Sequence, residues 1–172
     1  NNNVGIGTSA LGGQAGAGSA YNFTAANNVA VGVDALKVAT TGANNVAVGS
    51  NAGDALTTGS NNLAFGLNAG GAMTNNEHNI ILGTNAFTNA NLSEFGNIVI
   101  GSSAGGSIDD ASSHYNVLIG YTAGSGGTGT MVDCVAIGRS AMNSTGSNGV
   151  NGTIAIGTSA LTGLTSGGGN LA

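Results

Sequence analysis

The chain has 172 residues, of which 33 are Gly, none is Pro and only 5% are charged, and it contains no Trp. Seven acidic and two basic residues give a net charge of −5, which argues against a nucleic-acid partner because phosphate binding needs clustered Lys and Arg. No apolar run approaches the ~20 residues of a membrane-spanning helix, so we expect no membrane insertion by this segment.

A short phrase recurs along almost the whole chain: Asn or another polar residue, three apolar residues, a Gly, two variable residues and an Ala. The repeat Gly falls at positions 7, 32, 49, 66, 83, 101, 120, 138 and 157. The first step, from Gly7 to Gly32, is long, and every later step is close in length to the one from Gly32 to Gly49. A period this steady is typical of a solenoid. We therefore predict a single repeat domain over residues 1–172, with about nine coils and one larger loop within 8–27.

Each apolar triplet predicts a short strand, and the Gly that follows ends it. Because side chains alternate along a strand, the outer two residues share one face and the middle residue points to the other. Both faces are apolar, which is typical of strands that are covered on both sides. We expect the outer pair to face the interior of the coil and the middle residue to face a cover. The middle residues from the second strand onwards are Ala30, Ala47, Ala64, Ile81, Val99, Leu118, Ala136 and Ala155.

The cover can be another copy of the chain or a second sheet of the same chain. Three copies around an axis parallel to the solenoid would place the middle residues at a close-packed trimer seam. A two-sheet monomer would instead bury the same residues inside one chain. The sequence favours the all-β parallel β-roll as a homotrimer and leaves the monomer as the alternative.

An Asn precedes most of the predicted strands and defines a structural ladder. In parallel stacked coils, these residues would repeat at intervals of ~4.8 Å, so that each side-chain amide can bond to the next. The ladder positions are Asn28, Asn45, Asn62, Asn79, Asn97 and Asn116. Cys134 occupies the ladder position in a later coil, where it is interpreted as a small structural substitute rather than a nucleophile.

No residue pattern indicates catalysis, a metal site or a cofactor site, so we expect no enzyme activity. Acidic residues are spread over different coils, and no phosphate-binding, zinc or calcium-repeat motif is present. Aromatic residues in three segments that break the repeat are the remaining candidates for ligand contact, because an aromatic beside hydrogen-bond acceptors suits a sugar ring. These candidates for glycan contact are Tyr21, Phe95, His114 and Tyr115.

The phrase Asn-Asn-Val-Ala-Val-Gly-x-Asn-Ala-Gly resembles the head repeats of trimeric autotransporter adhesins and the related repeats of bacteriophage tail fibres. Residues 27–32, 44–49 and 61–66 carry the resemblance most plainly. It implies a left-handed parallel β-roll, an obligate trimer and a role at a host surface. Adhesin heads usually have a shorter repeat, so the longer period here is more similar to the phage-fibre form.

Two function classes follow from these observations. The first is a structural and host-attachment segment of an extracellular trimeric fibre, on a virion tail or a bacterial surface, whose turns contact a host glycan or protein. The second is a ligand-binding or ice-binding solenoid without catalytic activity. An ice-binding face needs Thr at a fixed outward position, and the residues that follow the repeat Gly are too uneven to favour it. They are Thr8, Val33, Ser50, Leu67, Thr84, Ser102, Tyr121, Arg139 and Thr158.

Overall fold

The computed structural model describes residues 2–12, 24–91, 93–109, 112–127, 129–146, 148–164 and 166–172. In these ranges the chain forms nine strands of three residues, one for each repeat, and no helix. The strands are β1 (Val4–Ile6), β2 (Val29–Val31), β3 (Val46–Val48), β4 (Leu63–Phe65), β5 (Ile80–Leu82), β6 (Ile98–Ile100), β7 (Val117–Ile119), β8 (Val135–Ile137) and β9 (Ile154–Ile156).

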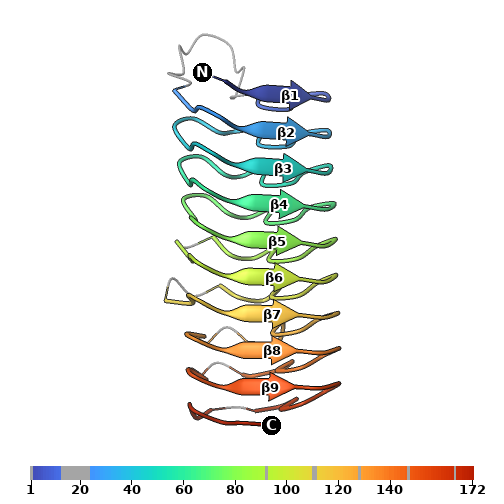
Figure 1. Ribbon diagram of the computed structural model, residues 1–172, viewed down its shortest axis with the longest axis vertical. Helices are drawn as coiled ribbons and strands as arrows, with labels where there is room; N and C mark the ends of the chain where they lie inside the picture. Colours follow the sequence, from blue (N-terminus) through green and yellow to red (C-terminus); the bar gives the residue numbers. More distant parts are fainter. Residues whose placement is uncertain are drawn as a thin grey trace.

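All nine strands lie in one parallel sheet whose spatial order follows the chain order (Figure 1). Each strand pairs in register with the next, so that Val46 lies beside Leu63 and Val48 beside Phe65. The predicted parallel β-solenoid is therefore confirmed. The chain takes seven strand-to-strand steps from β2 to β9.

The predicted larger loop, within 8–27, falls entirely in the connection from β1 to β2. Residues 13–23 lie outside the described residues, so the total of about nine coils stays a prediction. The pairing of Val4 with Val29 nevertheless continues the register of the later strands across this connection. The extra length is thus accommodated between strands without shifting the sheet.

The Gly after each strand is required by the stacking of one turn on the next. Gly49 has a φ of 136°, a value that side chains other than Gly rarely adopt. A Cβ atom on Gly49 would also collide with the backbone carbonyl oxygen of Gly66 in the next turn. The same two features recur at the equivalent Gly of most turns, which explains why this position never varies.

The middle residue of each strand from β2 to β9 points into the coil. Ala30, Ala47 and Ala64 are at most 2% exposed within the single chain, as are the five later middle residues. The prediction that these residues form a trimer seam is therefore wrong. They pack instead with the recurrent Ala of the turn and with larger side chains from the return segments, such as Leu36, Phe87 and Met131.

The outer residues of the strands point away from the coil. In every strand the first and third residues are half-buried or exposed, and all of them are Val, Ile, Leu or Phe. Phe65 and Ile156 are 53% and 59% exposed. One side of the solenoid is therefore a continuous apolar surface of two columns, which we call the outer sheet face.

The return segments contain turns without regular secondary structure. Their backbone hydrogen bonds also run between turns, for example from Thr57 N to Thr74 O at 2.8 Å. Contacts between strands involve only consecutive strands, as expected for a solenoid. Among the described residues, no helix is long and apolar enough to cross a membrane.

Candidate functional site

The Asn ladder runs through the interior beside the N-terminal ends of the strands. Asn62, Asn79 and Asn97 are each at most 3% exposed. The Oδ1 atom of each ladder Asn accepts the backbone N–H of the next, at 2.8–3.0 Å. The side-chain amide of each also donates to a backbone carbonyl of the return segment, as from Asn45 to Gly59 O at 2.9 Å. These side chains are fully used in the fold and are not available to a ligand.

Cys134 continues the ladder and is completely buried. Its backbone N–H donates to Asn116 Oδ1 at 3.0 Å, and its Sγ donates to Val150 O at 3.0 Å. Burial raises the pKa of the Cys134 thiol, because the thiolate would lose its hydration. The structural interpretation of this cysteine is confirmed.

A second, exposed column lies at the corner just before each ladder residue. Asn27, Asn44 and Asn61 adopt left-handed φ values of 58–62°. Their side chains are linked by Nδ2–Oδ1 hydrogen bonds of 3.2 and 3.3 Å. In later turns the corner position is taken by His78, Gly96, Tyr115 and Asp133. The polar corner is therefore regular in the early turns and irregular in the later ones.

The position immediately before the corner, which we call the pre-corner column, changes in the same part of the chain. Small residues, Ala26, Ala43 and Ser60, occupy it in the early turns. Glu77, Phe95 and His114 occupy it in three successive later turns, and parallel bridges pair Glu77 with Phe95 and His114 with Val132. Stacking thus places an acidic side chain and two rings next to one another on the surface.

Phe95, His114 and Tyr115 form an aromatic cluster across two adjacent turns. The centroids of the Phe95 and His114 rings are 4.2 Å apart, with 31° between their planes. The Tyr115 ring meets Phe95 edge-on, at 4.9 Å. Gly96 leaves the space for this ring, because a Cβ atom there would lie 2.8 Å from Tyr115 Cδ1. Tyr115 remains 55% exposed, so the cluster is open to solvent.

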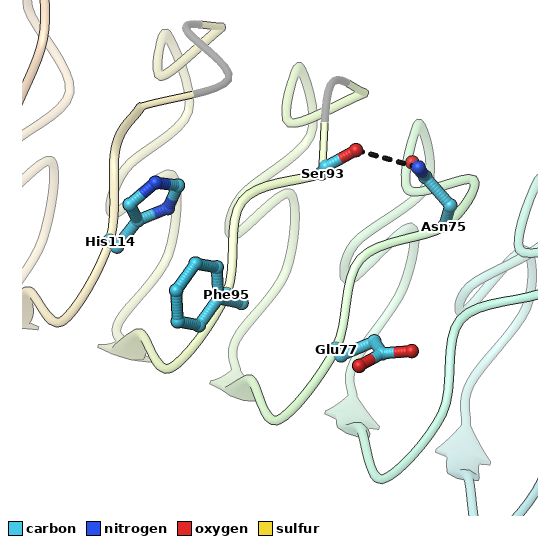
Figure 2. A pocket seen from close by; sticks show the side chains of 5 residues that line it. All are labelled: Asn75, Glu77, Ser93, Phe95 and His114. Carbon is cyan, nitrogen blue, oxygen red and sulfur yellow. Dashed lines mark hydrogen bonds between the residues drawn. The ribbon is translucent and has the colours of Figure 1, made fainter.

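A surface hollow of about 370 Å³ lies beside this cluster (Figure 2). It is lined by Asn75, Glu77, Ser93, Phe95 and His114. Asn75 Nδ2 donates to Ser93 Oγ at 2.6 Å, which joins two turns at one end of the hollow. The carboxylate of Glu77 has no ion pair or hydrogen bond among the described residues. The hollow thus combines ring faces with amide, hydroxyl and carboxylate groups.

The floor next to the hollow contains a buried carboxyl group. Glu94 is 0% exposed, and its Oε2 accepts a hydrogen bond from Asn76 Nδ2 at 2.6 Å. The backbone carbonyl of Glu94 also accepts from the ladder residue Asn79, at 3.0 Å. Glu94 therefore ties the interior of this turn to the Asn ladder, while its neighbours on either side, Ser93 and Phe95, line the hollow.

The sequence-predicted glycan contacts have different outcomes. Phe95, His114 and Tyr115 come together in one cluster, whereas Tyr21 lies outside the described residues. Sequence reasoning missed Asn75, Glu77 and Ser93 as companions of these rings. The signal that could have found Glu77 is the break in the pre-corner column, where small residues give way to large ones.

Of the charged residues that the structure describes, only Glu77 lines the hollow. Lys37 Nζ is 3.5 Å from Asp34 Oδ2 in an earlier turn. Burial is the main cause that raises the pKa of Asp54 above its ordinary value of 3.8. No group of three or more His, Cys, Asp or Glu side chains within the described part of the chain could hold a metal ion.

No family model, curated protein or solved structure matches the chain.

Proposed function

We propose that this chain is a rigid segment of an extracellular trimeric fibre, of the phage tail-fibre or bacterial adhesin-head type, in which the outer sheet faces of three copies pack together. The observation that carries this proposal is the outer sheet face itself. Two apolar columns run along all nine strands, and no charged residue interrupts them. Contiguous apolar surfaces of this kind mark interaction sites on soluble proteins.

The repeat of this surface favours a second copy of the chain as the partner. Side chains in each column recur once per strand, at the ~4.8 Å spacing of a parallel sheet. A partner that fits the whole length must present side chains with the same period, and another copy does so by construction. The net charge of −5 is carried outside the strands, so copies can approach through this face without bringing like charges together.

The trimer and the surface location rest on the resemblance of the repeat to adhesin heads and tail fibres. In this arrangement the solenoid is a spacer whose exposed turns can contact a host surface. The left-handed winding of the roll is part of the same proposal. A ligand-binding or ice-binding solenoid is the second candidate, and the exposed Val33, Leu67 and Tyr121 among the residues that follow the repeat Gly weaken it.

The mass in solution tests the proposal. Analytical ultracentrifugation of the isolated segment should give three times the chain mass of 16.3 kDa. The variant Phe65→Glu places a charge on the outer sheet face and should dissociate the trimer. Thr58→Glu, at an exposed position in a return segment, is the matched control and should leave the mass unchanged. A monomeric parent chain would overturn the proposal.

A further inference from the structure

The pre-corner column contains a local feature that the fold does not require. Equivalent positions of a solenoid share the same backbone environment, and Ala26, Ala43 and Ser60 satisfy it with small side chains. The later turns place a carboxylate and two rings in that environment instead. Neither the Asn ladder nor the outer sheet face accounts for this change. It creates a surface that differs from that of the earlier turns, where Ala26, Ala43 and Ser60 occupy the column.

The rings of this surface are not filling the core. Phe95 and His114 are half-buried, whereas Tyr115 is 55% exposed. Phe95 and His114 nevertheless both line the surface hollow. The Phe95 and His114 rings stack on each other, with centroids 4.2 Å apart and 31° between their planes, so each covers part of the other and leaves only its remaining surface to the hollow (Figure 2). Accessible aromatic surface next to polar groups is the chemistry with which proteins bind amphipathic ligands.

The polar groups of the hollow surround this surface with hydrogen-bonding capacity. Glu77 can accept two or more hydrogen bonds, and its carboxylate is not engaged by any described residue. Asn75 and Ser93 add an amide and a hydroxyl at fixed positions, because they are bonded to each other. Nδ1 of His114 is buried and has no hydrogen-bond partner among the described residues.

We propose that the hollow formed by Asn75, Glu77, Ser93, Phe95 and His114 is a binding site for a neutral sugar ring. The C–H face of the sugar packs on the surface of the Phe95 ring that His114 leaves open, and its hydroxyl groups bond to Glu77 and Asn75. The volume of about 370 Å³ lies at the lower end of the ~300–1,000 Å³ range of small-ligand sites, as suits one or two sugar units.

The charge of the site selects among sugars. No Lys or Arg lines the hollow, and Glu77 contributes a negative charge at its rim. A sialic acid or uronic acid would bring its own carboxylate towards that charge without a compensating cation. The site therefore favours neutral hexoses and N-acetylhexosamines over acidic sugars. This inference deepens the attachment role in the proposed function, on which its biological use rests.

A glycan array that carries neutral and acidic glycans, probed with the intact segment, tests the site. We expect the parent protein to bind neutral glycans in preference to acidic ones. Phe95→Ala should weaken binding by about tenfold or more, because it removes the ring on which the sugar packs. Glu77→Gln keeps the shape of an exposed side chain and should weaken binding several-fold. Tyr121→Ala removes an aromatic side chain that does not line the hollow and should bind like the parent.

Saturation-transfer difference NMR with the best-bound free sugar gives an independent readout. The strongest transfer should fall on the C–H face of the sugar, and Phe95→Ala should remove it. If Phe95→Ala lowers the thermal stability, Glu77→Gln decides the result alone. The site is overturned if the parent binds no neutral glycan, or if Glu77→Gln and Phe95→Ala both bind like the parent. If the parent is a monomer that binds sugar, the trimer proposal is overturned and the sugar site is supported. If the parent is a trimer that binds no sugar, the sugar site is overturned and the trimer proposal is supported.

Discussion

Oδ1 of Asn79 accepts two hydrogen bonds from Asn97, one from the backbone N–H at 3.0 Å and one from Nδ2 at 3.1 Å. Both residues are completely buried, so no water can replace either bond. One amide side chain therefore joins two consecutive turns and also defines the direction of the ladder.

Asn79→Ala should lower the free energy of unfolding by about 2 kcal/mol or more, because it leaves the buried N–H of Asn97 without an acceptor. Urea unfolding at a fixed protein concentration measures the change, since an oligomer has a concentration-dependent stability. Thr58→Ala, at an exposed position, should change the stability by no more than about 0.5 kcal/mol. Equal effects of the two substitutions would show that the ladder bonds contribute little.

Gly49→Ala should destabilise the chain by about 2 kcal/mol or more, because the φ of 136° is strained for Ala and the new methyl group collides with the carbonyl oxygen of Gly66. Gly149→Ala is the control, because the nearest atom to its Cβ would be Thr130 O, at 3.3 Å. Thermal unfolding followed by circular dichroism compares the two. Tolerance of Ala at position 49 would contradict the tight stacking of the turns.

Ala64→Glu should prevent the chain from folding, because it places a carboxylate in the interior of the coil. The neighbouring substitution Phe65→Glu changes the opposite face of the same strand and should leave the secondary structure intact. Far-ultraviolet circular dichroism distinguishes these outcomes. A folded Ala64→Glu protein would mean that the middle residues face outwards after all.

The pKa of Asp54 is raised in the folded state, mainly by burial, so its carboxyl group binds a proton more readily when folded than when unfolded. The contribution of Asp54 to folding stability is therefore fully present at pH values below its ordinary pKa of 3.8. This contribution is lost as the pH rises through the raised pKa of the folded state. Asp54→Asn cannot ionise, so the stability of the parent relative to this variant should fall over that range. Urea unfolding of both proteins at a series of acidic pH values measures the difference. A constant difference across the series would remove the role of burial.

The thiol of Cys134 should resist modification in the folded protein, because it is completely buried and its pKa is raised. A chromogenic disulfide reagent at mildly alkaline pH should react with less than about one tenth of the protein in buffer and with all of it in concentrated urea. Rapid reaction in buffer would show that the turn containing residues 131–134 opens readily.

Much of the fold follows from the sequence because the repeat carries strong physical constraints. Two residues recur at nearly fixed intervals: the Gly that packs closely against the next turn and the Asn that bonds to the next ladder Asn. Strand positions such as Val46–Val48 were therefore predictable. The sequence did not predict which face of each strand points into the coil. Alternation shows which side chains share a face, but it does not show which face is inside when both are apolar.

Side-chain size distinguishes the two faces in only some of the strands. In β2, β3 and β4 the middle residue is Ala, and the larger Val, Leu and Phe side chains point outwards. In β5, β6 and β7 the buried middle residues are Ile81, Val99 and Leu118, so size does not distinguish the faces there. The face that a partner would have to cover is therefore the one formed by the outer residues of the strands, which are apolar and partly exposed.

The candidate site was predictable only in part, because its residues come from turns of different length. Phe95 and His114 belong to two segments that break the repeat. They meet because Ile100 and Ile119 still pair in register, so the extra residues are absorbed elsewhere in the turn. The break in the pre-corner column marks Glu77, whereas Asn75 and Ser93 carried no signal of their own, since single polar residues in turns are common in this chain.

Each strand contacts only the strand before and the strand after it, which has a consequence for the origin of such a chain. A segment from one repeat Gly to the next, such as the segment from Gly49 to Gly66, can be duplicated or deleted without removing any contact between more distant turns. Duplication or deletion of such a segment would lengthen or shorten the rod by one ~4.8 Å step. Evolution can therefore change the length of the rod one turn at a time. The hollow stays intact as long as the turns that contain its residues are retained.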